Sequence, residues 1–422
     1  MNKALFKQIL LEQKQEIDRI FAKKIIPRDI EGKMKQVMAS DLIKVITGVR
    51  RCGKSVLAHQ LLKEKNYGYI NFDDERLVGV KAEDLNDFLE TLKEINPSFQ
   101  VLFLDEIQNI EGWELFVNRL KRQGYNITVT GSNAMLLSRE LASHLTGRHF
   151  SIELYPFSWK EFLAYQGVRL EEEDGYITER KALFKRLLEE YILSGGFPEV
   201  FSLEPKAQYL RELYDKIVSR DIILRYNIKY VRDLKEIALY AVSNFSSRMT
   251  FHKISRIFQM KSVHTVKNYL NYLEETYLLF FIHAFSFKLK ERLRAPRKVY
   301  GIDLGLINVL SARATPDYGK MMENLVFLEL KRENKEIYYY SHVHYEVDFL
   351  IKKDLRIEQL IQVCYSLDSD QTYKREIQSL LKASKELDCT NLLIITWDTE
   401  SEERFHAHTI KVIPLWKWLL TA

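Results

Sequence analysis

Gly48-Val-Arg-Arg-Cys-Gly-Lys54-Ser55 fits the pattern G-x-x-x-x-G-K-[ST] at every fixed position. A short β-branched run, Ile43–Ile46, precedes it, and the helical pattern Val56–Leu62 follows it. Glycines let such a loop curl so that successive backbone N–H groups face phosphate, and the helix N-terminus adds partial positive charge. The stretch therefore predicts an ATP site in which Lys54 reaches the β- and γ-phosphates and Ser55 ligates Mg²⁺. The residues predicted to contact the nucleotide are Gly48, Val49, Arg50, Arg51, Cys52, Gly53, Lys54, Ser55 and Val56.

Five short apolar runs mark the region around this loop, at Ile43–Ile46, Tyr69–Phe72, Val101–Leu104, Ile127–Val129 and Ile152–Leu154. Helical patterns lie between them, and one helix face is indicated by the spacing of Trp113, Phe116, Val117 and Leu120. Strands that alternate with helices favour a parallel sheet covered on both faces. We therefore expect an α/β fold built on the parallel sheet of a P-loop NTPase.

The third apolar run ends in two adjacent carboxylates, in Val101-Leu-Phe-Leu-Asp105-Glu106. Asp105 is placed to hold Mg²⁺, directly or through water, and Glu106 is placed to polarise the attacking water as a general base. Such a pair at a strand end is often only solvated. Its position downstream of a phosphate loop favours the catalytic interpretation.

Two further polar signals follow along the chain. The fourth run ends in Gly131-Ser132-Asn133, where Ser132 or Asn133 can hydrogen-bond the γ-phosphate or the water. A plain strand-to-helix turn is the alternative. Arg148 stands immediately before the fifth run and can donate a planar fork to a transferring phosphate. A surface arginine paired with a carboxylate is the alternative there.

The composition sets broader limits. A chain of 422 residues favours two or three domains. Its 63 basic and 58 acidic residues nearly balance, so nucleic-acid binding needs a local basic patch. Cys52, Cys364 and Cys389 lack a paired spacing, which indicates a reducing compartment. The start at Met1 lacks a signal-peptide stretch, and the apolar run Tyr277–Ile282 is far shorter than the ~20 residues of a membrane helix. We expect a cytoplasmic protein with no membrane partner.

Together these residues resemble the AAA+-like ATPases, within the P-loop group that carries an extra catalytic glutamate. The order of phosphate loop, intervening strand, Asp105-Glu106, polar strand end and Arg148 follows that family. In AAA+ proteins the arginine before the fifth strand often acts on a neighbouring subunit's nucleotide, so the resemblance implies a homo-oligomer. In regulatory relatives the ATPase is instead monomeric until triggered, and the residues do not choose between these states.

The chain more closely resembles a prokaryotic family usually described only as ATP-binding proteins, which joins an AAA-type ATPase to a C-terminal domain of unknown function. The motifs that carry this resemblance are the phosphate loop, Leu104-Asp-Glu-Ile-Gln108, Thr130-Gly-Ser-Asn-Ala134, Leu145-Thr-Gly-Arg148, Tyr155–Phe162 and Ser194-Gly-Gly-Phe-Pro-Glu199. The resemblance covers nearly the whole chain. It implies a P-loop ATPase core (41–157), a helical lid (158–230), a winged helix (231–310) and a restriction-endonuclease-like domain (320–422). The pattern of residues 1–40 itself predicts an N-terminal helical segment. The resemblance also implies that Pro198 lies near the adenine, with a helix-breaking turn as the alternative.

Residues 231–310 show three helical patterns, the third capped by Ser262, and then a basic stretch, Lys288–Lys298, predicted as a strand region. This order suits a helix-turn-helix with a wing. A double-stranded DNA partner would meet the third helix in its major groove. Its phosphates would meet the basic residues of the wing, Lys288, Lys290, Arg292 and Arg294. Winged helices in ATPases also serve as lids or protein contacts, so a protein partner stays open.

The last hundred residues resemble the restriction-endonuclease fold, with Glu323 on a helix and Asp348 on a strand. An active site of that fold needs Asp on one strand and Glu-x-Lys on the next, where the carboxylates hold Mg²⁺ and the lysine orients water. Here Gln362 stands in place of the glutamate and Cys364 in place of the lysine. An amide is a poor Mg²⁺ ligand and a thiol supplies no cation, so we expect an inactive scaffold or binding surface.

These patterns support three functional hypotheses. The first is a Mg²⁺-dependent ATPase that couples its nucleotide state to a partner through the winged-helix and nuclease-like domains. The second is a DNA-binding regulator in which ATP is a structural ligand. The third is a Mg²⁺-dependent nuclease, in which Glu358 or Lys374 would have to replace the missing residues by migration.

Overall fold

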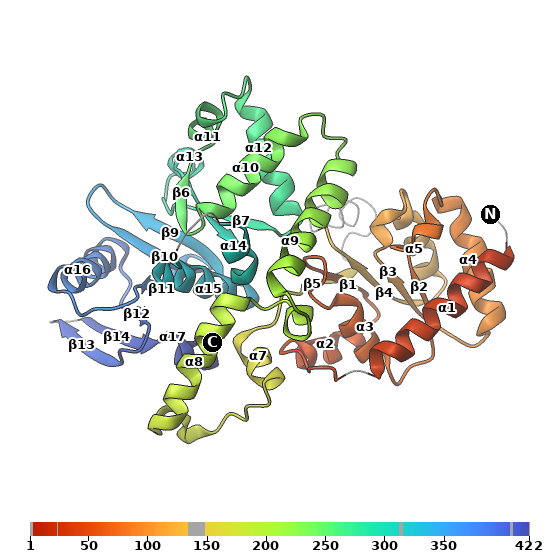
Figure 1. Ribbon diagram of the computed structural model, residues 1–422, viewed down its shortest axis with the longest axis horizontal. Coiled ribbons are helices and arrows are strands. Elements are labelled where there is room, and N and C mark those ends of the chain that lie inside the picture. The colour runs from red at the N-terminus through yellow and green to blue at the C-terminus, as the bar shows by residue number, and fades with distance from the viewer. Residues whose placement is uncertain (1–2, 23, 134–147, 312–314, 406–407, 422) are drawn as a thin grey trace. The chain divides into compact units, whose positions relative to one another are not determined.

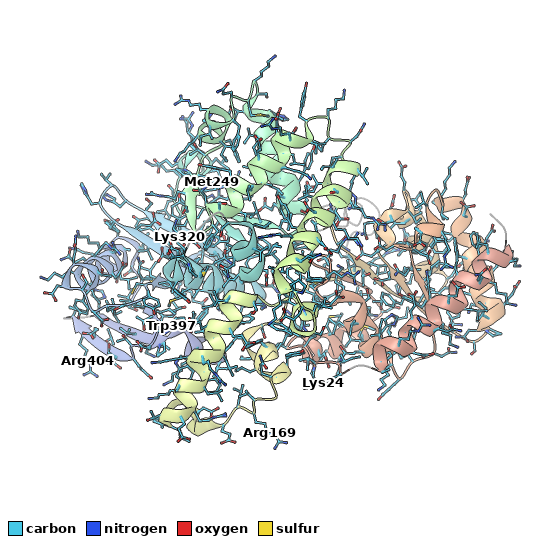
Figure 2. All side chains as sticks on the ribbon, viewed as in Figure 1. Lys24, Arg169, Met249, Lys320, Trp397 and Arg404 are labelled. Carbon is cyan, nitrogen blue, oxygen red and sulfur yellow. The ribbon has the colours of Figure 1, made fainter. Side chains whose placement is uncertain are left out.

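The protein is described by a computed structural model that covers residues 3–22, 24–133, 148–311, 315–405 and 408–421 (Figure 1). The chain divides into two compact units. The first comprises Met1–Phe157 with Glu275–Tyr277, and the second comprises Ser158–Glu274 with Leu278–Ala422. Side chains fill the interior of each unit, as Figure 2 shows, so each has its own hydrophobic core.

A five-stranded sheet forms the centre of the first unit. Its strands are β1 (Ile43–Thr47), β2 (Tyr67–Asn71), β3 (Val101–Asp105), β4 (Asn126–Gly131) and β5 (His149–Glu153). They lie in the order β2-β3-β4-β1-β5, and every neighbouring pair is parallel. Each strand overlaps one of the five predicted apolar runs. The predicted α/β fold with a parallel sheet is confirmed.

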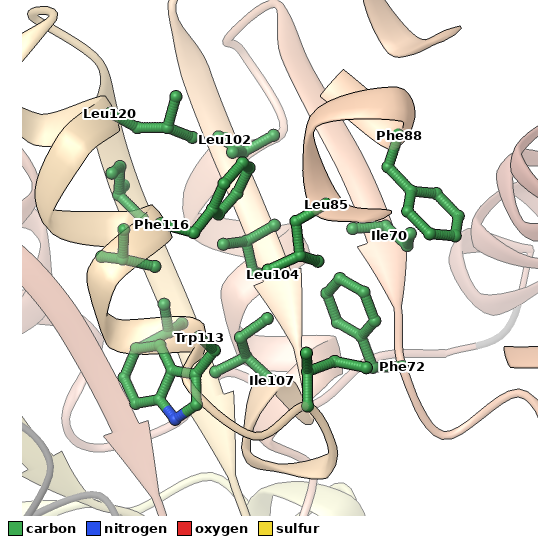
Figure 3. Close-up of a cluster of buried hydrophobic side chains, with 14 of the residues drawn as sticks. Ile70, Phe72, Leu85, Phe88, Leu102, Leu104, Ile107, Trp113, Phe116 and Leu120 are labelled. Carbon is green, nitrogen blue, oxygen red and sulfur yellow. The ribbon is translucent and has the colours of Figure 1, made fainter. Parts of the chain in front are cut away.

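Helices cover both faces of this sheet. Alternate strand residues point to opposite sides, so apolar side chains on both faces have to be buried. The helices of the first unit are α1 (Lys3–Phe21), α2 (Glu31–Met38), α3 (Lys54–Leu62), α4 (Leu85–Ile95) and α5 (Trp113–Arg122). On β3, Leu102 and Leu104 join a cluster with side chains of α4 and α5 (Figure 3). Phe103 instead meets His59 of α3, with the ring centroids 4.9 Å apart. Burial on both faces explains the unbroken apolar run that predicted this strand.

The N-terminal helix α1 covers the edge of the sheet at β2. The amide of Gln13, which is buried, pairs with the backbone of Asn71 as a neighbouring strand would. Its Nε2 donates to the Asn71 carbonyl oxygen at 3.0 Å, and its Oε1 accepts from the Asn71 N–H at 2.9 Å. On the same helix, Phe6 stacks on Phe88 of α4 with a centroid separation of 3.8 Å. Helix α1 is therefore part of the first unit's core.

The second unit begins with helices. They are α7 (Trp159–Tyr165), α8 (Thr178–Ser194), α9 (Lys206–Lys216), a π-helical segment (Ile217–Leu224), α10 (Val231–Ser243), α11 (Phe251–Ile257) and α12 (Val263–Glu275). A small antiparallel sheet follows, in the order β6-β8-β7. Its strands are β6 (Ser247–Met249), β7 (Leu279–His283) and β8 (Arg297–Gly301).

The basic stretch Lys288–Lys298 differs from the predicted strand region. Its middle forms the short helix α13 (Leu289–Arg294). The hydroxyl of Ser286 accepts from the Lys288 N–H at 3.1 Å and donates to Glu291 at 2.8 Å, which favours a helical turn at this point. Lys298 lies within β8 and is only 3% exposed. Lys298 is therefore not part of an exposed basic wing.

A six-stranded mixed sheet forms the C-terminal part of the second unit, in the order β13-β14-β12-β11-β10-β9. Its strands are β9 (Glu336–Ser341), β10 (Glu346–Lys353), β11 (Arg356–Val363), β12 (Leu392–Thr396), β13 (Ser401–Phe405) and β14 (His408–Pro414). The accompanying helices are α14 (Leu304–Leu310), α15 (Tyr318–Arg332), α16 (Asp370–Leu387) and α17 (Leu415–Thr421). The Phe285 N–H donates to the Tyr339 carbonyl oxygen at 2.7 Å, which links the end of β7 to β9. Within the described parts of the chain, no helix is both long and apolar enough to cross a bilayer.

Replacing Gln13 by alanine should loosen the β2 edge. The change removes both hydrogen bonds to Asn71, and a lost buried partner costs about 1–3 kcal/mol. We expect faster hydrogen–deuterium exchange in a peptide spanning residues 67–72, measured by mass spectrometry. Gln8→Ala is the matched control, because Gln8 lies on the same helix and its amide bonds Glu12 on the surface. Equal exchange in the two variants would contradict the role of Gln13.

Candidate active site

The phosphate loop connects β1 to α3 and depends on two glycines. Gly48 has a φ of 148°, and a Cβ there would lie 2.1 Å from the carbonyl oxygen of Leu154. Gly53 has a φ of 100° and is the N-cap residue of α3. Glycine alone takes such backbone angles without strain. The two fixed glycines of the motif therefore let the loop lie against the chain that leaves β5 and then turn into the helix.

Arg28 supports this loop from the N-terminal segment, and sequence reasoning missed it. Its Nη1 donates to the Cys52 carbonyl oxygen at 2.9 Å, and its Nη2 donates to the Tyr155 carbonyl oxygen at 2.6 Å. The guanidinium also lies over the ring of Phe157, 5.1 Å from its centroid. Arg28 thus ties the loop to the chain after β5. Its only sequence signal is an arginine after Pro27, which carries no motif.

Lys54 begins α3 and its ammonium group is buried among oxygen atoms. Its Nζ donates to the carbonyl oxygens of Gly48 and Val49, each at 3.2 Å. It also lies 3.3 Å from Oε1 of Glu106. Burial would lower the pKa of Lys54, but the neighbouring groups, Glu106 foremost and Asp105 among them, together outweigh it and raise that pKa above its ordinary value. Lys54 is therefore a fixed cation at the base of the loop.

Asp105 ends β3 and faces Ser55 across the site. The Ser55 hydroxyl donates to Oδ1 of Asp105 at 3.0 Å, and the Thr130 hydroxyl donates to the same oxygen. Burial, then the charge of Glu106, raises the pKa of Asp105 to about 6. Neighbouring oxygen ligands of an octahedral Mg²⁺, each about 2.1 Å from the ion, lie about 3 Å apart. The Ser55 and Asp105 oxygens have that spacing and fit a Mg²⁺ ion.

Glu106 follows with a left-handed backbone, φ 51°. Non-glycine residues in that region are strained, and they cluster at active sites. Oε2 of Glu106 accepts from the Ser132 hydroxyl at 3.0 Å and from Nε2 of Gln108 at 2.5 Å. Burial alone would raise the pKa of Glu106, but the charges of Lys54 and Arg50, with those hydrogen bonds, lower it to about 2. Glu106 is therefore an ionised carboxylate held by donors and cations.

Three further residues were predicted to lie near the nucleotide, namely Ser132, Asn133 and Cys52. Ser132 contacts the carboxylate of Glu106, so the structure places it within the site. Asn133, immediately after it, is fully buried. Cys52 is also buried, and burial raises the pKa of its thiol. Gln108, which sequence reasoning quoted only as part of a family motif, is a further member of the site.

Arg148 lies at the amino-terminal end of the parallel strands, whereas the phosphate loop lies at their carboxyl-terminal end. It stands just before β5, and its carbonyl oxygen accepts from the N–H of Ile43, the first residue of β1. Because β1 and β5 are parallel, the loop after β1 is about 16 Å away, five residues at about 3.3 Å each. The structure therefore does not bring Arg148 to its own chain's phosphate site. An action on a neighbouring subunit stays a prediction.

Pro198 belongs to the second unit, where it begins a 3₁₀ turn, Pro198–Ser202. The preceding Gly196 N–H donates to Oδ2 of Asp303 at 2.6 Å. Asp303 also caps α14 by accepting from the Leu306 N–H at 2.8 Å. This turn is thus anchored to α14, and the proximity of Pro198 to adenine stays a prediction.

A second cluster of charges lies in the second unit, centred on Lys298 of β8. Its Nζ lies 2.9 Å from Glu323 Oε1, 2.7 Å from Glu346 Oε1 and 2.9 Å from Asp348 Oδ1. Tyr300 donates to the same Glu323 oxygen at 2.7 Å. These carboxylates raise the pKa of Lys298 well above its ordinary value although burial opposes them. An ammonium group from the small sheet is therefore the shared partner of Glu323, Glu346 and Asp348.

Of the two residues that replace the predicted nuclease motif, Gln362 supports this cluster. The Val363 N–H donates to Asp348 Oδ2 at 3.0 Å, and the Gln362 side chain accepts from the Asp348 N–H at 3.2 Å. Cys364 is buried, which raises the pKa of its thiol to about 12, so it carries no charge at neutral pH.

Glu358 pairs with Lys335 at 3.6 Å instead of joining the cluster. Lys374 is exposed on α16, so neither residue proposed for migration replaces the missing ones. No His, Cys, Asp and Glu group arranged to hold a metal is found among the described residues.

Comparison with known sequence families divides the chain into three. Residues 40–163 match a family described as an AAA domain. Residues 185–317 and 318–418 match two families described as domains of unknown function, DUF8612 and DUF4143. The AAA match contains the phosphate loop and the Asp105–Glu106 pair. The first unit therefore contains an AAA domain with a phosphate loop, and C-terminal domains of unknown function follow it.

Two curated proteins are similar over most of their length. An uncharacterized protein of Methanocaldococcus jannaschii, MJ1544, is 37% identical over 99% of this chain and 96% of its own. An uncharacterized protein of Haemophilus influenzae is 36% identical over 75% of this chain and 81% of its own. Among solved structures, the Walker-type ATPase PABY2304 of Pyrococcus abyssi is 17% identical, covers 68% of this chain and 96% of its own, and has a TM-score of 0.46.

Lys298→Met should destabilise the second unit because three carboxylates lose their shared cation. Removing one partner of a buried ion pair costs about 3–5 kcal/mol. We expect a lower melting temperature by circular dichroism, with part of the loss recovered when Glu323→Gln and Asp348→Asn are added. Lys352→Met is the matched control, since Lys352 pairs with Glu336 at the surface of the neighbouring strands. A Lys298→Met protein that melts like wild type would refute the role of this cation.

Proposed function

Since this chain belongs to the same family as the uncharacterized protein of Methanocaldococcus jannaschii and carries an AAA domain, we propose that it is a Mg²⁺-dependent ATPase. One observation carries the proposal. The Lys54 ammonium, the Ser55 hydroxyl and the carboxylates of Asp105 and Glu106 meet at the carboxyl edge of the sheet, beside the loop Gly48–Ser55. These are the kinds of group that ATP hydrolysis needs.

Each of these residues has a distinct role in the proposal. The loop amides and Lys54 hold the phosphates, and Ser55 and Asp105 hold Mg²⁺, which would neutralise charge on the phosphate oxygens. Glu106 orients the attacking water and accepts its proton. With a pKa of about 2 it is a weak base while Lys54 faces it. We propose that phosphate replaces Glu106 as the partner of Lys54 and so raises the basicity of this carboxylate.

We further propose that the ATPase couples to a partner through the second unit. The proposed parts are a helical lid (158–230), a winged helix (231–310) and a restriction-endonuclease-like domain without nuclease activity (320–422). Three helices with a small antiparallel sheet support the winged helix. The cation at Lys298 supports an inactive nuclease site.

Helix α13 is the proposed contact surface for that partner. Three large apolar side chains are exposed there, with Phe287 81%, Leu289 57% and Leu293 61% accessible. Basic side chains lie among them, namely Lys288, Lys290, Arg292 and Arg294. A solvated wing needs no such apolar surface, so this mixture favours a partner. An acidic protein surface with an apolar centre fits it, and double-stranded DNA is the alternative.

Two substitutions test the ATPase. Lys54→Ala should lose nucleotide binding, because the buried cation is removed. Glu106→Gln should bind nucleotide but release phosphate at least about a hundredfold more slowly, the usual size of a lost general base. A phosphate-release assay and a fluorescent nucleotide titration measure both. Glu111→Gln is the control, since Glu111 is exposed five residues farther on. Full turnover by both site variants would refute the proposal.

A second measurement separates the two kinds of partner. If α13 contacts DNA, a duplex should bind in a gel shift that weakens steeply with salt and should change the ATPase rate. Changing Lys288, Lys290, Arg292 and Arg294 together to glutamine should then flatten that salt dependence. The control is the same change at Lys374, Lys382, Lys385 and Lys411, which are exposed elsewhere on the second unit. Unchanged duplex binding in the α13 variant would exclude α13 as the DNA contact.

A further inference from the structure

Arg50 lies inside the phosphate loop with its guanidinium turned into the protein. Only 8% of its side chain is exposed, and Nη1 lies 2.9 Å from Oδ2 of Asp73, which follows β2. Asp73 is the more exposed partner, at 22% of its side chain. A guanidinium next to the loop backbone is therefore held by a carboxylate that water still reaches.

Arg50 is attached to the phosphate loop close to the proposed reaction centre. The carbonyl oxygen of Val49, the residue before it, accepts from Lys54 Nζ at 3.2 Å. Lys54 is the residue proposed to hold the γ-phosphate, and Glu106 is the residue proposed to hold the attacking water. Lys54 Nζ also lies 3.3 Å from Glu106 Oε1, so a guanidinium on the residue after Val49 is attached close to where the γ-phosphate would react.

We propose that Arg50 is a catalytic residue that exchanges Asp73 for the γ-phosphate of ATP bound to its own chain. The inference rests on the proposed ATPase function and deepens it. The oxygen of water bonds to the γ-phosphorus, the bond from that phosphorus to the β–γ bridging oxygen breaks, and Glu106 accepts the water proton. Arg50 donates hydrogen bonds to the γ-oxygens throughout and keeps its protons.

Electrostatics favours the exchange. Nη1 of Arg50 bonds a carboxylate that water still reaches, whereas a guanidinium can bond a phosphate through two parallel donors. ADP has no γ-phosphate, so Arg50 should stay with Asp73 when ADP is bound. Arg148 lies at the other edge of the sheet. Arg50 would therefore supply in cis the arginine that AAA+ relatives take from a neighbouring subunit.

Substitutions of Arg50 and of Asp73 should change the affinity for an ATP analogue in opposite directions. Binding of β,γ-imido-ATP and of ADP is measured by calorimetry for wild type, Arg50→Gln and Asp73→Asn. Arg50→Gln should weaken the ATP analogue roughly ten- to a hundredfold, the range for a hydrogen bond to a charged group, and leave ADP nearly unchanged. Asp73→Asn should tighten the analogue, because it removes the competitor. If the pair is only structural, both variants weaken both nucleotides alike, and the proposal is wrong.

A mixing experiment tests whether Arg50 acts in cis. Arg50→Gln and Lys54→Ala chains are each purified, mixed in equal amounts and assayed for phosphate release. In a cis site neither protein can complement the other, so the mixture should stay inactive and wild-type turnover per chain should not change on dilution. Recovered activity in the mixture would show that Arg50 acts on another chain and would overturn the assignment.

Failure of this inference differs from failure of the ATPase proposal. If wild-type protein neither binds β,γ-imido-ATP nor releases phosphate, the ATPase itself is refuted. If wild type hydrolyses ATP while Arg50→Gln keeps the wild-type ratio of analogue to ADP affinity, only the role of Arg50 is refuted. Arg50→Lys, which retains the charge but not the fork, should fall between wild type and Arg50→Gln.

Discussion

The ion pair between Lys54 and Glu106 is the constraint on which the phosphate site depends. Two adjacent carboxylates at the end of β3 repel each other in a buried place, and a cation must compensate them. Lys54 does so while its ammonium group also bonds two carbonyl oxygens of its own loop. The loop conformation and the ionisation of Glu106 are therefore linked, and phosphate would compete for the same ammonium group.

The second unit also buries a lysine against carboxylates, with the opposite consequence. Lys54 has only one carboxylate partner within ion-pair distance among the described residues, so a phosphate can take part of its coordination. Lys298 is enclosed by three such partners. The backbone hydrogen bond from Phe285 to Tyr339 also joins the small antiparallel sheet to the six-stranded sheet. The first lysine is positioned for exchange of partners, whereas the second connects β8 to β10 of the six-stranded sheet.

Local patterns predicted the sheet and the loop, because burial on two faces and glycine backbone angles both depend on residues that are close in the sequence. Contacts between distant residues could not be predicted in this way. Arg28 meets Tyr155, and Lys298 meets Asp348, across long separations that no local pattern marks. Arg148 shows a different limit. A residue before a parallel strand lies at the amino edge, so its distance from the loop was implied by the predicted sheet itself.

Coverage of β2 by α1 has a consequence for how the chain can be divided. The AAA family match begins at residue 40, after α1 has ended. A chain shortened to that boundary would lose Gln13 and Phe6 and leave β2 with unpaired backbone groups along a hydrophobic flank. Strand edges of this kind template pairing with other chains and promote aggregation. The compact unit that carries the AAA domain is thus larger than the AAA family match, because it includes α1.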